Sequence, residues 1–171
     1  VDFVFHLAGV NRPKNVEEFA LGNADLTSAL CQEIIQTKRL IPIIYTSSVQ
    51  ATLDNPYGKS KKAAEQVLMD FSAQIESPVY LYRLPNVFGK WCKPNYNSAV
   101  ATFCYNISHD LPVQINDANA KVRLVYVDDV VKHFMSIMDG ELVEPGLNNV
   151  NPVYEVTVGD LSEKIQLFKD S

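Results

Sequence analysis

The sequence predicts an α/β protein with a mostly parallel sheet covered by helices on both faces. Short apolar segments alternate along the 171 residues with longer segments whose apolar residues recur every three or four positions. The first three strand-like segments are continuous rather than alternating apolar runs, which is typical of strands buried on both faces. Strands that alternate with helices in this way build a parallel sheet with helices on its faces.

The first expected strand covers residues 1–7, a β-branched and aromatic run that ends at Ala8 and Gly9. A helix is expected over residues 15–37, because apolar residues recur there at helical spacing. Its expected buried side consists of Phe19, Leu26, Leu30 and Ile34, with Ala29 and Ile35 beside them. The second expected strand, residues 41–46, is followed by two serines.

A turn at residues 54–56 is expected to open the second helix, since Asp54 or Asn55 can cap a helix and Pro56 is tolerated in its first turn. This helix is expected over residues 57–75. Its apolar residues at helical spacing are Ala64, Val67, Leu68, Phe71 and Ile75. Residues 79–83 form the third expected strand.

The second half of the chain is expected to contain shorter elements after a polar loop over residues 85–97. The expected strands are residues 113–115, 122–125 and 147–150. The expected helices are residues 98–108, 128–138 and 157–169. Asp128 and Asp129 are interpreted as a helix cap and first turn, and Thr157 or Asp160 as the cap of the last helix. Since no repeat or linker divides the chain, we expect one α/β domain.

Composition excludes several classes of function. The chain has 15 basic and 20 acidic residues and a net charge of −5, so its surface would repel a nucleic-acid backbone. No apolar run approaches the roughly 20 residues that a membrane span needs. The three cysteines are widely spaced and form neither a disulfide framework nor a zinc motif. We therefore expect no nucleic acid, membrane or metal partner, and the reduced cytoplasm as location.

Polar residues that directly follow the expected strands are the candidates for a site, because ligands of such sheets bind beyond the carboxyl ends of the strands. Tyr57 and Lys61 stand four residues apart at the start of a helix just past Ser47 and Ser48, so both point to one side. A positive charge near a phenol lowers its pKa from about 10, which suits general acid–base catalysis. A Tyr-x-x-x-Lys pair alone is often only a solvated helix face, and its placement here is what favours chemistry.

Several motifs, taken together and in order, resemble the extended short-chain dehydrogenase/reductase family, also described as NAD-dependent epimerase/dehydratase. They are His6-Leu-Ala-Gly9, Asn23 within residues 22–27, Thr46-Ser-Ser48, Tyr57-Gly-Lys-Ser-Lys61, Arg83-Leu-Pro-Asn-Val-Phe-Gly89 and Val125-Tyr-Val-Asp-Asp-Val130. Residues 54–61 and 89–97 are most similar to CapF-type capsular polysaccharide enzymes. The resemblance implies a Rossmann-like, doubly wound sheet with a small substrate-binding part over about residues 85–171.

The resemblance also implies an activity: NADPH-dependent reduction, at C4, of a UDP-linked 4-keto-6-deoxy-N-acetylhexosamine for bacterial capsule or surface polysaccharide. NAD is the alternative cofactor. The implied catalytic residues are Tyr57 as proton donor, Lys61 as its charged neighbour, Ser48 on the reacting oxygen with Ser47 as the competing assignment, and Asn23 in a proton relay. The implied cofactor-binding residues are Ala8, Gly9, Ser47, Tyr57, Lys61 and Pro85. The implied substrate-binding residues are Ser48, Asn86, Asn97, Ser98 and Arg123.

The sequence departs from the family pattern in its cofactor half. None of the seven glycines form the G-x-G-x-x-G loop that cradles a pyrophosphate, and the residue that distinguishes NAD from NADP is also missing. We therefore expect residues 1–171 to be the C-terminal portion of one domain, inactive alone. The resemblance implies a dimeric full-length parent. An epimerase and a non-catalytic dinucleotide-binding relative remain alternatives. A dehydratase is disfavoured because Val49 and Gln50 replace its acid–base pair.

Overall fold

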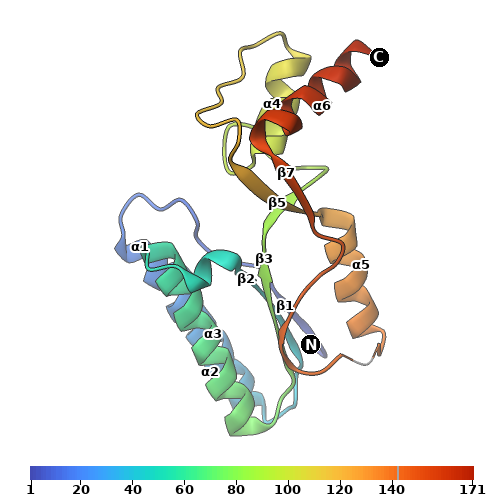
Figure 1. Cartoon of the computed structure of the whole chain (residues 1–171). Helices are drawn as coiled ribbons and strands as arrows, with labels where there is room; N and C mark the ends of the chain where they lie inside the picture. The colour runs from blue at the N-terminus through green and yellow to red at the C-terminus, as the bar shows by residue number, and fades with distance from the viewer. Residues whose placement is uncertain (142) are drawn as a thin grey trace. The chain divides into compact units, whose positions relative to one another are not determined.

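The computed structural model describes residues 1–141 and 143–171, which form two compact units (Figure 1). The first unit consists of Val1–Leu84 and Ser136–Asn149, and the second of Pro85–Met135 and Val150–Ser171. Each unit has its own sheet and its own apolar core. The segment from residue 85 onward thus contributes residues 136–149 to the first unit.

The first unit is built on a parallel sheet of four strands in the order β1-β2-β3-β6, which confirms the expected α/β class. These strands are β1 (Val4–His6), β2 (Ile43–Ser48), β3 (Val79–Leu84) and β6 (Gly146–Asn148). Strand β1 lies at the sheet edge and is shorter than the expected residues 1–7. Val1 and Leu7, at the ends of the expected run, are 79% and 60% exposed, so they are not the buried strand residues that the sequence predicts.

The expected helix over residues 15–37 begins as α1 (Glu17–Phe19), widens into a π-helical turn (Ala20–Asp25) and continues as α2 (Leu26–Thr37). The expected buried side is wrong in part, because Leu26 is 43% exposed. Ala29 is also exposed, whereas Ile34 is buried as expected. Asn23, Thr27 and Cys31 share the inner face with Ile34. The wider π turn, with its extra residue, gives a polar side chain a buried position, where it must form hydrogen bonds.

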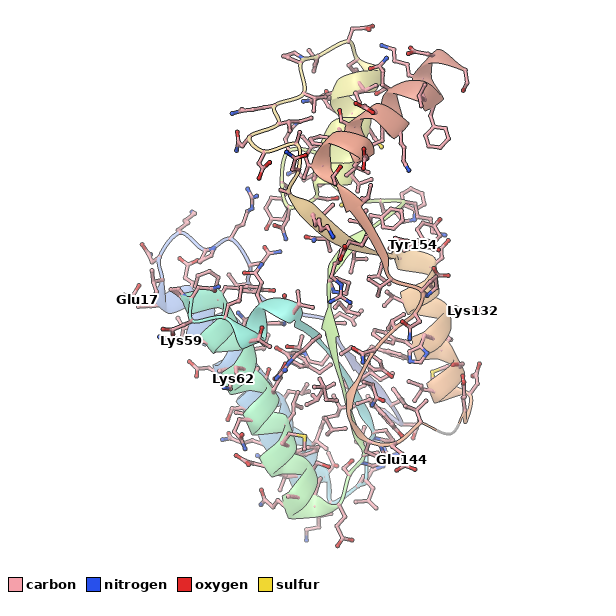
Figure 2. All side chains as sticks on the ribbon, in the orientation of Figure 1. Glu17, Lys59, Lys62, Lys132, Glu144 and Tyr154 are labelled. Atoms are coloured by element: carbon pink, nitrogen blue, oxygen red, sulfur yellow. The ribbon has the colours of Figure 1, made fainter. Side chains whose placement is uncertain are left out.

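Helix α3 (Pro56–Ile75) begins as the sequence predicts. Asn55 Oδ1 accepts a hydrogen bond from Gly58 N at 2.8 Å, and Pro56 is the first helical residue. Helices α2 and α3 lie side by side against the sheet, and Lys59 and Lys62 are exposed on α3 (Figures 1 and 2). Their apolar residues form the core with β2 and β3. That core consists of Cys31, Ile34, Ile41, Ile43, Tyr45, Ala64, Leu68, Phe71, Val79 and Leu81.

The second unit contains a three-stranded sheet in the order β4-β5-β7. Its strands are β4 (Asn86–Phe88), parallel to β5 (Lys121–Tyr126), and β7 (Tyr154–Thr157), antiparallel to β5. Its helices are α4 (Ala99–Ser108), α6 (Val158–Asp170) and most of α5 (Val127–Met138). Strands β4 and β7 were not predicted. The expected strand at residues 113–115 is wrong, because Val113 and Ile115 pack against the core without joining the sheet.

Three smaller predictions concern caps and membranes. Asp128 and Asp129 lie in the first turn of α5, and Thr157 caps α6 by accepting a hydrogen bond from Asp160 N at 3.1 Å. Among the described residues, no helix has both the length and the apolar character that crossing a membrane requires.

Candidate functional site

Three consecutive residues at the carboxyl end of β2 each contact a different side chain of α3. Thr46 O accepts a hydrogen bond from Lys61 Nζ at 2.8 Å, and Ser47 Oγ donates one to Glu65 Oε1 at 2.5 Å. The side chain of Ser48 lies close enough to the Tyr57 phenol to lower its pKa. The first turns of α3 therefore lie along the end of β2, where ligands of parallel sheets bind.

Tyr57 is half-buried, and its ring centroid lies 5.7 Å from that of Phe19. Burial raises the pKa of the Tyr57 phenol above its usual value of 10, and the nearby Ser48 side chain offsets part of this rise. The sequence predicts a lowered pKa, and the structure corrects this direction. The cause is that the phenol loses solvent, whereas the Lys61 ammonium is directed toward Thr46 O. At neutral pH the phenol carries its proton, as a proton donor must.

Lys61 is only 4% exposed. Its Nζ lies 4.4 Å from the centroid of the Tyr45 ring as well as on Thr46 O. Burial lowers the pKa of Lys61 to about 8, and the carboxylate of Glu65 acts in the opposite direction. The loop after β1 approaches the same amine, since a Cβ on Gly9 would lie 3.4 Å from Lys61 Nζ and 2.7 Å from Asn23 Oδ1. Only glycine fits there without displacement.

Asn23 is 1% exposed and joins this loop to α3. Its Oδ1 accepts a hydrogen bond from Val10 N at 3.0 Å. Its Nδ2 donates to Val10 O at 3.0 Å and to Ser60 Oγ at 2.9 Å. Both ends of the amide are thus engaged in holding the loop. This geometry favours a positioning role for the side chain over the expected place in a proton relay.

A partly buried ion pair that sequence reasoning missed lies beside these residues. Arg83 on β3 binds Glu65 through two hydrogen bonds, from Nε at 2.9 Å and from Nη2 at 2.7 Å. Glu65 is 6% exposed and also accepts the hydrogen bond from Ser47. The only available signal was its spacing, four residues after Lys61 on the same helix.

Of the expected site residues, the first unit brings together Gly9, Asn23, Ser48, Tyr57 and Lys61, with the exposed Ala8 next to Gly9 in the chain. Ser47 lies at the same strand end, but its hydroxyl is bound to Glu65.

The remaining expected residues belong to the second unit. They are Pro85, Asn86, Asn97, Ser98 and Arg123. Asn86 Nδ2 donates a hydrogen bond to Arg123 O at 3.1 Å, so these two neighbours on β4 and β5 meet. Ser98 caps α4 by accepting a hydrogen bond from Ala101 N at 3.3 Å, while Asn97 and Arg123 are exposed.

The donors of the first unit fit the ribose of a nicotinamide dinucleotide. An ammonium group has three N–H donors, and the bond to Thr46 O uses one of those of Lys61. Ser47 fits less well than expected, because its hydroxyl is directed to a carboxylate. Among the described residues, no group of three or more His, Cys, Asp or Glu side chains is placed to hold a metal ion.

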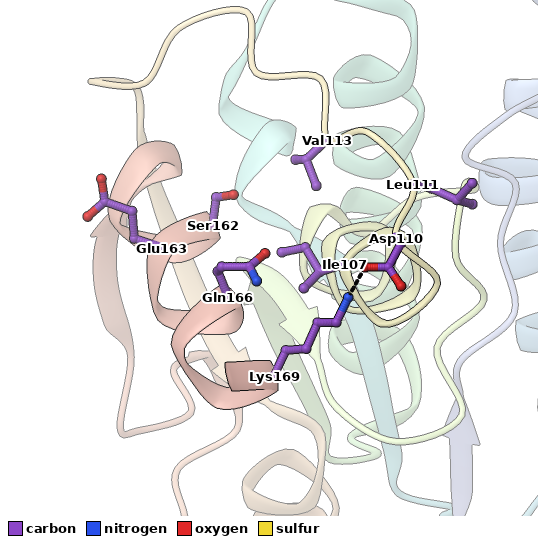
Figure 3. A pocket seen from close by; sticks show the side chains of 8 residues that line it. All are labelled: Ile107, Asp110, Leu111, Val113, Ser162, Glu163, Gln166 and Lys169. Carbon is purple, nitrogen blue, oxygen red and sulfur yellow. Dashed lines mark hydrogen bonds and ion pairs between the residues drawn. The ribbon is translucent and has the colours of Figure 1, made fainter. Parts of the chain in front are cut away.

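A surface groove of about 460 Å³ lies in the second unit between α4 and α6 (Figure 3). Ile107 and Val113 form part of its lining, and the ion pair of Asp110 with Lys169 borders it. None of the expected site residues lines this groove. It is therefore not the candidate site.

Comparison with known proteins places these features in a family. The model of the NAD-dependent epimerase/dehydratase family matches residues 1–150. The chain is 56% identical over 171 residues to a Pseudomonas aeruginosa UDP-2-acetamido-2,6-beta-L-arabino-hexul-4-ose reductase, and covers 46% of that protein. It is 30% identical over 120 residues to human dTDP-D-glucose 4,6-dehydratase, of which it covers 33%. The chain thus spans less than half the length of these relatives.

Solved structures show the same fold. The capsular polysaccharide assembling protein CapF from Staphylococcus aureus aligns over the whole chain with a TM-score of 0.87 and 41% identity, and 45% of CapF is covered. UDP-glucuronic acid 4-epimerase from Bacillus cereus, in complex with NAD, aligns over the whole chain with a TM-score of 0.86 and 17% identity, and 61% of it is covered. The second likeness is one of fold alone.

Proposed function

The chain belongs to the NAD-dependent epimerase/dehydratase family, and from this premise we propose that the full-length protein is a nucleotide-sugar reductase. Its proposed substrate is a UDP-linked 4-keto-6-deoxy-N-acetylhexosamine, reduced at C4 for the synthesis of capsule or surface polysaccharide. The observation that carries the proposal is the contact of Ser48 with Tyr57 one helical turn before the buried Lys61. The 56% identity to a reductase of such a sugar supports it.

In this proposal Tyr57 donates its proton to the O4 atom of the sugar, and the Ser48 hydroxyl holds that oxygen by a hydrogen bond. The nicotinamide cofactor supplies the hydride when bound. Lys61, held on Thr46 O, offers its remaining N–H donors to the ribose hydroxyls. Gly9 and Asn23 keep the loop after β1 close to this amine.

NADPH is the proposed cofactor on the strength of the resemblance to CapF-type enzymes, and the substrate contacts proposed for Asn86, Asn97, Ser98 and Arg123 rest on the same resemblance. A homodimer is proposed for the full-length protein. The exposed apolar residues Leu21, Leu26 and Met69, on the two helices that would form the interface, support it.

The decisive experiment is the stoichiometry of the reaction. Full-length protein is mixed with the UDP-4-keto sugar and NADPH, and cofactor oxidation is followed by absorbance together with product analysis. A reductase consumes one NADPH for each sugar reduced. Interconversion of sugars without net cofactor consumption would instead identify an epimerase, which needs the same tyrosine and lysine. Absence of turnover combined with dinucleotide binding would identify a non-catalytic relative and refute the proposal.

A further inference from the structure

The ion pair of Glu65 with Arg83 lies among the residues of the proposed site but takes no part in the mechanism above. Ser47 and Arg83 are direct partners across strands β2 and β3, and both bind the carboxylate of Glu65 from α3. A single buried side chain thus joins the catalytic helix to two strands at their carboxyl ends.

Stability alone is a weak explanation for this pair. Glu65 is buried, whereas the side chain of Arg83 is 27% exposed. Removing the carboxylate from water costs several kcal/mol, and apolar residues of similar volume often stabilise a fold equally well or better. The bidentate hydrogen bonds from Arg83 do, however, fix the Glu65 carboxylate in one orientation. Fixed charges beside a reacting group are a recurrent means of setting its protonation state.

Lys61 is the group on which this charge acts. It lies one helical turn before Glu65, and its nitrogen is bound to the residue that precedes Ser47 on β2. The titratable groups that contact Lys61 or act on its charge are Glu65 on α3, His6 on β1 and Tyr45 on β2. Tyr57 precedes Lys61 by one turn of α3, and Arg83 on β3 is bound to Glu65. Glu65 is the only carboxylate in this set. Without it, burial alone would favour the neutral amine.

We propose that Glu65, held in place by Ser47 and Arg83, is a positioning residue that keeps the buried Lys61 ammonium charged and fixes the end of β2 beside Tyr57. The consequence of this inference for catalysis rests on the proposed function. It assigns Ser47 to the support of Glu65 and leaves Ser48 for the reacting oxygen. The carboxylate of Glu65 raises the pKa of Lys61, whereas burial lowers it, so Glu65 favours the charged amine.

The test measures the titration of Lys61 in the full-length protein and does not depend on turnover. Competitive labelling with acetic anhydride across pH 6–11, read by mass spectrometry, follows the neutral amine of Lys61. Glu65→Gln removes the negative charge with little change of shape, so half-labelling should move to lower pH. Arg83→Gln removes the positive charge that faces the carboxylate, so half-labelling should move to higher pH. Asp70→Asn, an exposed carboxylate on the same helix, is the matched control and should cause no shift.

The opposite signs separate a charge effect from loosening of the fold, and Arg83→Gln keeps the test informative if Glu65→Gln does not fold. The pH at which kcat/KM for sugar reduction changes on the alkaline side should shift in the same directions, lower for Glu65→Gln and higher for Arg83→Gln. At pH 7.5, kcat of Glu65→Gln should be about 10-fold to 100-fold lower, the loss typical of residues that orient a functional side chain from behind. Equal labelling curves, or shifts of one sign in both variants, would overturn the proposal. A labelling shift without any reductase activity would refute the proposed function but leave the role of Glu65 intact.

Discussion

Replacing Asn23 by alanine should loosen the loop that follows strand β1. The amide of Asn23 forms three hydrogen bonds, two with the backbone of Val10 and one with Ser60. Val10 is half-buried, so water can replace part of what is lost, whereas the buried Ser60 would keep only the bond that it donates to Tyr57 O. At about 0.5–1.5 kcal/mol for each bond, the loop should lose roughly 1.5–3 kcal/mol of local stability.

Such a loss corresponds to local opening that is about 10-fold to 100-fold more frequent. Hydrogen exchange measured by mass spectrometry on the full-length protein should show this increase in peptides that cover residues 7–12. Asp25→Ala, an exposed position in the same π turn, is the control and should leave these peptides unchanged. Unchanged exchange at residues 7–12 in a folded Asn23→Ala variant would refute the assigned hydrogen bonds.

Two further predictions concern other parts of the same unit. Gly58→Ala should lower kcat by about 10-fold or more, because its new Cβ would lie 2.2 Å from Gln50 O and would push the turn after β2 away from Tyr57. A steady-state assay of sugar reduction checks this, and an unchanged kcat would contradict the close packing of Gly58 against Gln50. Burial, together with the charge of Lys61, lowers the pKa of His6 below 6.5, so the folded state should lose stability as the pH falls below about 6.5 through the folded pKa. The thermal midpoint measured from pH 7.5 to 5.5 should therefore fall less steeply in His6→Gln, and equal slopes would exclude His6 as a cause.

Local signals in the sequence predicted the elements of the first unit well. The β-branched runs, the cap at Asn55 and Pro56 and the apolar spacing of α3 are all local signals, and the structure confirms them. The inner face of the first helix was not predictable in this way. A π turn rotates Asn23 and Thr27 inward, and apolar spacing cannot reveal a position that is buried because of its hydrogen bonds.

The second unit was predicted less well, because its short strands depend on pairing between distant segments. Strand β4 has only three residues, and β7 becomes a strand by pairing with β5, more than 25 positions earlier. Residues 113–115 carry the same local apolar signal but find no partner strand. Short strands of this kind are set by tertiary context rather than by composition.

For the candidate site, the sequence identified Tyr57, Lys61 and Ser48 through spacing and resemblance, and the structure places their side chains at one strand end. It could not separate Ser47 from Ser48, since adjacent strand residues point to opposite faces and the choice depends on Glu65. It also gave the wrong direction for the pKa of Tyr57, because burial of the phenol is a property of the fold.

The most direct test of the proposed reductase is the turnover of Tyr57→Phe in the full-length protein. The variant removes only the phenolic oxygen next to Ser48, so sugar and cofactor should still bind. Loss of a general acid should lower kcat by about 100-fold to 10,000-fold, with little change in the affinity for the UDP-sugar measured by calorimetry. Turnover close to that of the unaltered enzyme would contradict the account.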